Sequence, residues 1–293
     1  MPTEQEHHEQ LDNVKFYYAK AQKFYEHAWY GGNKGLGLHY GLWDEGVGNR
    51  IQAIVKENEV LADLAHIHSG DLVLDAGCGV GGSGIWLSQN RGAEVVGINI
   101  AENQLGIAQE LKHKFAAEDV VFTEADYHRL PFKSGSFDIF WSLESIEHSD
   151  NPELLIQEAF RILKPGGEAV IAGTFMGRGE PTKEQEKQLL VGFQAAGAFN
   201  DFRSADNIAW LMRDSGFGKV KNIDVTKLVM PSAREMRIMC QLGLPFARLG
   251  HSINGFVSDI MVKNTEWGTY QENLFKEDIT SYNILVAEKL LND

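Results

Sequence analysis

Cysteine, basic charge and long apolar runs are all scarce in this sequence of 293 residues. Its two cysteines, Cys78 and Cys240, are too few for a disulfide framework, and Cys78 lies in a dense glycine run that a disulfide would distort. No apolar run approaches the roughly 18 residues of a membrane span, and the polar stretch from Met1 to Leu11 has no apolar signal segment. We therefore expect free thiols, a cytoplasmic location and no stable membrane insertion.

Basic residues are outnumbered: 27 lysines and arginines face 41 aspartates and glutamates, which gives a net charge of −14. A surface of this sign repels phosphate backbones, so nucleic acid is not expected as a partner. His7 and His8 could be imagined as metal ligands, but in a polar terminal segment we expect them to be solvated and expect no metal site. The remaining composition is that of an ordinary globular protein.

Strand and helix patterns alternate through the middle of the chain. Strands are expected at 73–76, 94–98, 120–124, 139–142 and 168–173, and helices at 83–90, 102–115 and 152–163. This alternation is typical of an α/β fold with a parallel sheet and right-handed crossovers. Further strands at 219–225 and 282–288 would complete seven, the last one antiparallel.

Helical additions flank this core. Residues 1–68 are expected to hold helices at 11–28 and 49–67 with a glycine- and aromatic-rich loop at 29–44 between them, either a lid or a well-packed irregular loop. The core would span 69–293, with an insertion at about 177–280. In that insertion we expect a polar surface excursion at 177–188 and a helix at 207–215. A Met-rich helical stretch follows at 231–256, either core or pocket.

The run from Val73 to Gly82 breaks from an apolar strand into a glycine loop. Gly77, Gly79 and Gly82 match the spacing G-x-G-x-x-G, which alone would indicate a dinucleotide site. Such a site requires an acid about 20 residues later, at the end of the second strand, but Asn99 stands there. The acid is instead Asp75, directly before the loop, where a carboxylate suits a ligand with ammonium and sulfonium charges.

The run Asp75-Ala76-Gly77-Cys78-Gly79 resembles the first motif of the class I S-adenosylmethionine (SAM) methyltransferases, and 137–138 and 163–167 are typical of the same family. The resemblance implies a Rossmann-like, seven-stranded, mostly parallel sheet with helices on both faces, and SAM as cofactor. It also implies an acid that accepts from the adenine amine, with a bulky neighbour packing on the ring. The implied cofactor residues are Asp75, Gly77, Gly79, Asn99, Gln104, Asp126, Tyr127 and Ser142.

A second constellation, Glu144, Glu147 and His148, follows the fourth strand. If the segment turns helically, the three side chains share one face and converge. The segment resembles its counterpart in the tocopherol and sterol C-methyltransferases, the coclaurine-type N-methyltransferases and the cyclopropane fatty acid synthases, and the coclaurine-type enzymes imply that these three are catalytic. They could act as a base or stabilise a cation, or they could be favourable acids at a helix N-terminus.

These patterns predict a SAM-dependent methyltransferase acting on a small, partly apolar metabolite: prenylated, phenolic or an alkaloid-like amine. The expected acceptor-binding residues are Tyr18, His39, Tyr40 and Met239. Alternatives are an N-methyltransferase of a small polar amine of the glycine or phosphoethanolamine type, a SAM-binding cyclase or binding protein that does not methylate, and, more distantly, a nicotinamide enzyme. The oligomeric state stays open, with a homodimer as one option.

Overall fold

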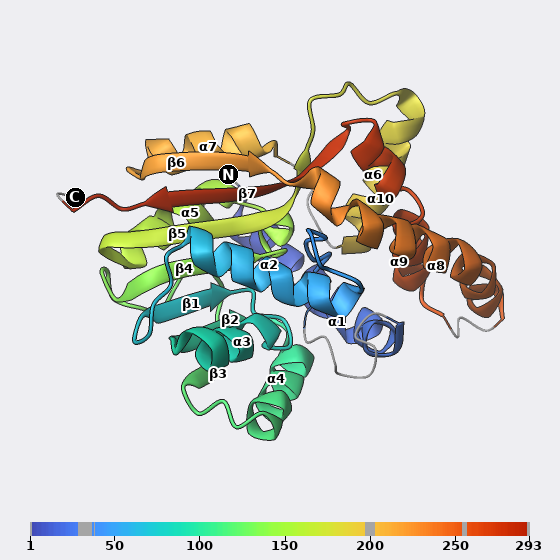
Figure 1. Cartoon of the computed structure of the whole chain (residues 1–293). Coiled ribbons are helices and arrows are strands. Elements are labelled where there is room, and N and C mark those ends of the chain that lie inside the picture. Colours follow the sequence, from blue (N-terminus) through green and yellow to red (C-terminus); the bar gives the residue numbers. More distant parts are fainter. Residues whose placement is uncertain (1, 29–36, 38, 197–202, 254–256, 292–293) are drawn as a thin grey trace.

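A seven-stranded sheet forms the centre of the protein in this computed structural model, which describes residues 2–28, 37, 39–196, 203–253 and 257–291 (Figure 1). The strand order is β3-β2-β1-β4-β5-β7-β6, and β7 runs antiparallel to both of its neighbours. This confirms the expected mostly parallel sheet with an antiparallel last strand. The strands are β1 (Leu72–Ala76), β2 (Glu94–Asn99), β3 (Val120–Glu124), β4 (Phe137–Leu143), β5 (Leu163–Met176), β6 (Gly218–Asp224) and β7 (Thr280–Glu288).

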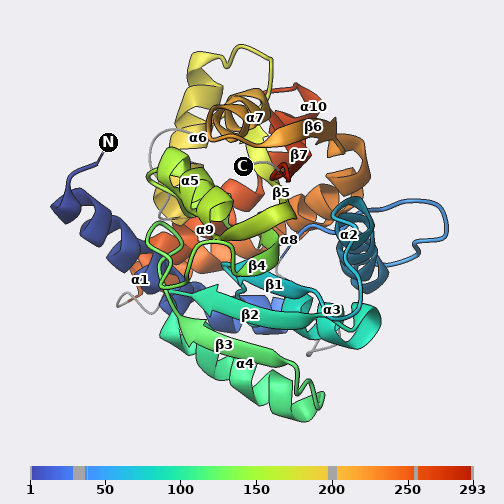
Figure 2. The same cartoon turned by 90° about the vertical axis from the view of Figure 1, so that its left-hand side faces the viewer.

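Two apolar layers cover the two faces of the sheet, because successive side chains of a strand point to opposite sides. Val73 belongs to the layer formed with α2 (Arg50–Leu64), α3 (Gly82–Arg91) and α4 (Glu102–Lys114). The next residue, Leu74, belongs to the layer formed with α5 (Pro152–Ile162) and α7 (Ala205–Asp214), and Figure 2 shows the sheet between the two groups of helices. Packing against both layers holds the ends of the strands in place, and the candidate site lies at those ends.

The first helix, α1 (Glu4–Ala28), begins earlier than its apolar pattern predicts. Thr3 and Glu6 bond reciprocally, since the Thr3 backbone N–H donates to the Glu6 carboxylate at 2.7 Å and the Glu6 N–H donates to the Thr3 hydroxyl at 3.2 Å. This arrangement is a capping box, which satisfies donors at a helix start. The segment expected to be a frayed polar terminus is therefore the first turns of a helix. The loop at 29–44 lies largely outside the described residues, which resume at 37 and 39.

The insertion between β5 and β7 holds more helix than predicted. The polar excursion expected at 177–188 is mostly exposed, but no helix was predicted in its second half, where α6 (Lys183–Ala196) begins after a similar bonded pair, Thr182 and Gln185. The Met-rich stretch forms α8 (Thr226–Ser252), followed by α9 (Asp259–Gly268) and α10 (Gln271–Lys276). Figure 1 shows α8 and α9 side by side, beyond the ends of the strands. None of the helices in the described ranges is long and apolar enough to cross a membrane.

The two halves of the Met-rich helix α8 lie in different surroundings. Met236, Met239 and Cys240 line a cavity over the sheet. Further along, Leu242 and Phe246 are 69% and 75% exposed. The core interpretation of this stretch is therefore wrong for its second half.

Candidate active site

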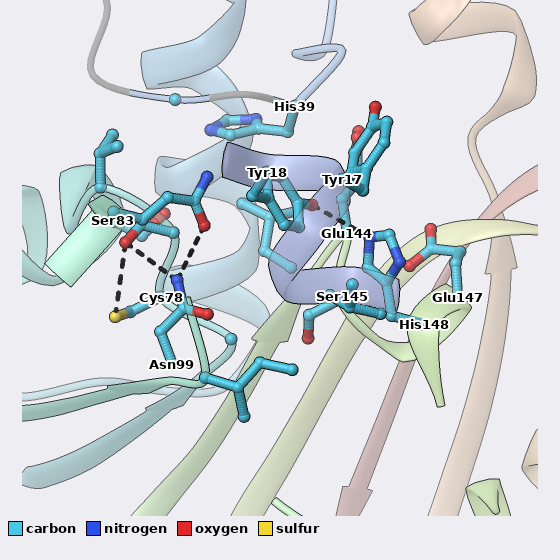
Figure 3. A pocket seen from close by; sticks show the side chains of 18 of the residues that line it. Tyr17, Tyr18, His39, Cys78, Ser83, Asn99, Glu144, Ser145, Glu147 and His148 are labelled. Carbon is cyan, nitrogen blue, oxygen red and sulfur yellow. Dashed lines mark hydrogen bonds between the residues drawn. The ribbon is translucent and has the colours of Figure 1, made fainter. Parts of the chain in front are cut away.

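A cavity of about 240 Å³ opens at the carboxyl ends of β1, β2 and β4. The strand order reverses between β1 and β4, and the crevice at such a switch point is where open α/β sheets bind ligands. Figure 3 shows Cys78, Ser83 and Asn99 on one side of this cavity and Glu144, Glu147 and His148 on the other. The first group comes from the glycine loop and β2, and the second follows β4.

The glycine loop needs its glycines for two physical reasons. Gly77 and Gly79 have φ angles of 86° and 54°, in the left-handed region that side chains disfavour. A Cβ at Gly77 would also lie 2.4 Å from the Cβ of Ser145, so the loop could not approach the turn after β4. Both glycines line the cavity, as predicted.

Asp75 lies at the end of β1 and lines the cavity. Its Oδ2 atom is buried and accepts no hydrogen bond. Burial raises the pKa of Asp75 to about 7, although a backbone N–H from Gly84 opposes the rise. A buried carboxyl with one unpartnered oxygen favours a cationic ligand group beside it, because such a group would compensate the lost hydration.

Asn99 and Gln104, the expected ribose grip, both line the cavity and bond to each other. The Asn99 amide donates to Gln104 Oε1 at 2.9 Å, and the Gln104 amide donates to Gln22 Oε1 at 3.1 Å. Gln22 comes from α1, so the first helix supports the cofactor side of the cavity. Its contribution was not foreseen from the sequence, since a glutamine on a helix carries no distinctive pattern.

Asp126 and Tyr127 also line the cavity, after β3. Burial would raise the pKa of Asp126, but hydrogen bonds from His128 and His7 outweigh it and hold the pKa below its ordinary value. The prediction that His7 is solvated is wrong: its ring bonds Asp126 Oδ2 and Asp150 Oδ2, each at 2.8 Å. The reason is that α1 begins early enough to carry His7 across the end of β3.

Ser142 lies behind the cavity wall. It is not among the residues that line the cavity, and its hydroxyl lies 2.8 Å from the hydroxyl of Ser145. Its contact with the cofactor stays a prediction. Ser145 does line the cavity and donates to the carbonyl of Ala76 in a 2.6 Å hydrogen bond. Sequence reasoning missed Ser145 because only the folded chain places it opposite Gly77.

Glu144, Glu147 and His148 all line the cavity, but they do not share a helical face. Only 146–148 turn, as a short 3₁₀ helix, and Glu144 precedes it with a φ of 46°. The expectation of a shared α-helical face is therefore wrong. Glu144 reaches the cavity from a left-handed residue, and Glu147 and His148 reach it from the 3₁₀ turn. The three side chains have different partners.

Glu144 belongs to a buried chain of polar groups. The hydroxyl of Tyr282 lies 2.9 Å from Glu144 Oε1 and 2.8 Å from Glu57 Oε1, and Glu57 Oε2 lies 2.5 Å from His39 Nδ1. One hydroxyl proton cannot serve two carboxylates, so one carboxyl must itself be protonated. Burial, together with the charges of Glu57 and Glu147, raises the pKa of Glu144 well above its ordinary value, which favours the neutral form of this carboxyl.

Glu57 and Tyr282 were not identified from the sequence. Glu57 did carry a signal: it lies on the apolar face of α2 with Ile54 and Leu61, and it is fully buried. A charged residue on such a face requires buried partners. Tyr282 gave no comparable signal within its strand.

Glu147 is held differently. Its Oε1 atom accepts a 2.7 Å hydrogen bond from the Thr174 backbone, while its Oε2 atom is buried and accepts none. Burial raises its pKa to about 7, against the opposing effect of the Thr174 bond. Gly173 makes room for it, since a Cβ there would lie 2.3 Å from Oε1. A carboxyl with this pKa exchanges protons near neutral pH.

The residues expected to bind the acceptor lie around these acids. Tyr18 and His148 are joined by a 3.0 Å hydrogen bond between the hydroxyl and Nε2. The backbone N–H of Tyr40 donates to Glu144 Oε1 at 2.8 Å, and His39 and Met239 line the same cavity. The structure thus brings all four into one cavity, and their contact with an acceptor stays a prediction.

Comparison with known proteins identifies relatives. Residues 74–171 match the methyltransferase domain family. Methyltransferase GfsG of Streptomyces halstedii is 31% identical over 198 residues, which cover 67% of this chain and 70% of that protein. The 27-O-demethylrifamycin SV methyltransferase of Amycolatopsis mediterranei (strain S699) is 30% identical over 204 residues, covering 68% and 72%.

Among solved structures, the [4+2]-cyclase SpnF superposes with a TM-score of 0.75 and 21% identity, covering 96% of this chain and 97% of SpnF. At this level of identity the likeness shows the fold alone.

Proposed function

The chain belongs to the SAM-dependent methyltransferases, and from that premise we propose that it methylates a hydroxyl group of a small, partly apolar molecule, with Glu147 as the base. The observation that carries this proposal is the buried, unpartnered Oε2 of Glu147 at the cavity. SAM supplies a methyl group on a positively charged sulfur. The reaction therefore needs an aligned nucleophile and a group that takes its proton.

The cofactor side of the cavity fits SAM in charge and shape. Asp75, whose Oδ2 accepts no hydrogen bond, supplies a counter-charge for a cationic group, and Gly77 and Gly79 leave the loop without side chains at these two positions. Asn99 and Gln104 present amide groups suited to ribose hydroxyls. Tyr127 offers an aromatic surface for adenine, while Asp126 keeps acceptor capacity because each carboxylate oxygen has two lone pairs.

The acid side of the cavity suits proton removal. Glu147 Oε2 accepts the proton of the acceptor's O–H, which leaves the oxygen as the nucleophile. Its pKa of about 7 places it close to working pH, where a general base contributes about 10²- to 10⁴-fold. Glu144 is bonded to Tyr282 and to the backbone of Tyr40, and these contacts give it a positioning role in the wall of the cavity.

The acceptor is inferred to be partly apolar because Val14, Met236, Met239 and Trp267 line the cavity near these acids. A phenol or alcohol is favoured over an alkaloid-like amine or a prenylated carbon for one further reason. The relative from Amycolatopsis is named for an acceptor that lacks an O-methyl group.

A second candidate is a cyclase that keeps SAM without transferring its methyl group. The likeness to SpnF, whose printed description is a [4+2]-cyclase, motivates it. Such an enzyme would need the cavity but not a base at Glu147, so the two functions differ in how they respond to loss of that carboxylate.

The test incubates the purified protein with SAM and a panel of phenols, alcohols, amines and prenylated quinols, and measures S-adenosylhomocysteine. We expect turnover with a phenol or alcohol and a loss of about 10²-fold or more in Glu147→Gln. Glu186→Gln, which changes an exposed acid on α6, is the matched control. Tight SAM binding without S-adenosylhomocysteine from any acceptor would refute methyl transfer and favour the cyclase.

A further inference from the structure

His7, His128 and Asp150 form a cluster at the edge of the cofactor cavity. One ligand atom from each of them lies within 4.8 Å of the other two. His7 comes from α1, His128 from the loop after β3, and Asp150 from the connection between β4 and α5. The three belong to segments far apart in the sequence, and the side chains of His7, His128 and Asp150 are only 12%, 2% and 0% exposed.

Asp150 is placed between the two imidazoles. Its Oδ2 lies 2.8 Å from His7 Nδ1, and its Oδ1 lies 3.4 Å from His128 Nε2. Oδ1 is fully buried and takes part in no hydrogen bond. A buried carboxylate oxygen in this state requires a positive partner, because nothing else compensates its lost hydration.

Asp126 orients both imidazoles from the opposite side. Its Oδ2 lies 2.8 Å from His7 Nε2, and its Oδ1 lies 2.8 Å from His128 Nδ1. Because a carboxylate only accepts, each histidine donates one ring N–H to Asp126. The other nitrogen of His7 is hydrogen-bonded to Asp150, and that of His128 lies near Asp150. This matches the carboxylate–histidine arrangement that fixes the tautomer of metal-bound histidines and raises their basicity.

We propose that His7 Nδ1, His128 Nε2 and a carboxylate oxygen of Asp150 bind one divalent transition-metal ion of the zinc class. Two imidazoles and a carboxylate are a ligand set suited to zinc and its neighbours, and they leave a further position for water. The hydroxyl of Ser149, now 2.8 Å from His128 Nε2, gives up that contact to the metal. Binding also displaces the proton that lies between His7 Nδ1 and Asp150 Oδ2, and this proton is released to solvent. No redox step is involved.

The metal would join α1 to the sheet across the cofactor cavity. Asp126 and Tyr18 of α1 both line that cavity. Gln22, also of α1, accepts a hydrogen bond from Gln104 in the cavity wall. Binding of the ion stabilises the folded arrangement in which α1 lies against the strand ends, since metal affinity adds to the stability of the state that holds it. The inference is independent of which acceptor the enzyme methylates.

The test titrates chelator-treated, full-length protein with Zn²⁺ against a competing chromogenic chelator, without SAM. We expect one tightly bound equivalent, a zinc-dependent rise in melting temperature, and ligand-field absorption with Co²⁺ as the substitute ion. His7→Gln and Asp150→Asn should abolish all three signals. Asp126→Asn should weaken zinc binding by about 10- to 100-fold, as loss of an orienting carboxylate does elsewhere.

The matched control is His8→Gln, because His8 is the exposed neighbour of His7 and lies outside the cluster. It should bind zinc as the unmodified protein does. Circular dichroism without metal checks that His7→Gln is folded. Equal zinc binding by His7→Gln and the unmodified protein would overturn the proposal, as would the absence of any equivalent of bound zinc. Either result would leave the cluster as a hydrogen-bonded contact that holds α1.

Discussion

Replacing Glu147 with glutamine is expected to stabilise the protein at alkaline pH while it removes the base. Glutamine keeps the size of the side chain, and its carbonyl can still accept the N–H of Thr174. What it removes is a carboxyl that the fold keeps buried, with one oxygen unpartnered. The substitution therefore separates the energetic consequence of burying a charge from the loss of a contact.

The size of the effect follows from the pKa. Glu147 has a folded-state pKa of about 7 against an ordinary value of 4.5, because burial disfavours the ionised form. Because the pKa is raised on folding, the free energy of unfolding is highest at low pH, where Glu147 is protonated in both the folded and the unfolded protein. It falls as pH rises from 4.5 through 7, because the unfolded protein then loses this proton more readily than the folded protein does. The gap corresponds to about 3 kcal/mol of unfolding free energy at 1.36 kcal/mol per pKa unit.

The assay is urea denaturation of the unmodified protein and Glu147→Gln at pH 5, 7 and 9. We expect the two to be close at pH 5 and Glu147→Gln to be more stable by about 2 to 3 kcal/mol at pH 9. Glu186→Gln, at an exposed position, should show no such pH-dependent gain. A difference between the unmodified protein and Glu147→Gln that is the same at all three pH values would refute the reasoning, because the carboxyl would then not be titrating between them.

Three further outcomes test other parts of the site. Gly173→Ala should lower kcat by about 10-fold or more with SAM affinity retained, because its Cβ would displace Glu147; an unchanged kcat contradicts this. Asp75→Asn should weaken SAM binding by about 10- to 100-fold, and SAM affinity of the unmodified protein should fall below pH 7 as Asp75 becomes neutral; calorimetry showing equal affinities contradicts this. Tyr282→Phe should lower the unfolding free energy by about 1 to 3 kcal/mol, since Glu144 loses a buried partner; equal denaturation midpoints contradict this.

Local patterns determined much of the fold. The strand at 120–124 was predicted with its observed bounds, and the glycine loop fell between a strand and a helix as its spacing indicated. These elements could be predicted because their apolar residues recur at regular spacing and their turns contain glycines that can adopt the left-handed region. Both signals lie within a short stretch of the chain. The polar helix α6 was missed because its surface is mostly charged and its capping pair is easily passed over.

The lining of the cavity was predictable for the same reason, since Asp75, Gly77, Asn99 and Asp126 each lie at or near a strand end that the apolar pattern indicates. Their contact with the cofactor stays a prediction. Ser145 was not identified, because only the folded chain places it opposite Gly77. Glu144 was expected on a helical face, but the segment makes only a short turn after a left-handed residue.

The sequence by itself determined the donor of the methyl group, because that information is local to one loop and its neighbouring strand ends. Only the tertiary structure decided how the acids divide their work. Tyr282 meets Glu57 from 225 residues away, and His7 meets Asp150 from 143 residues away. Burial and such distant contacts set the pKa of each carboxyl and decide which carboxyl oxygens lack a hydrogen-bond partner. Neither burial nor a distant contact produces a periodic pattern or a motif spacing that could be recognised in the sequence.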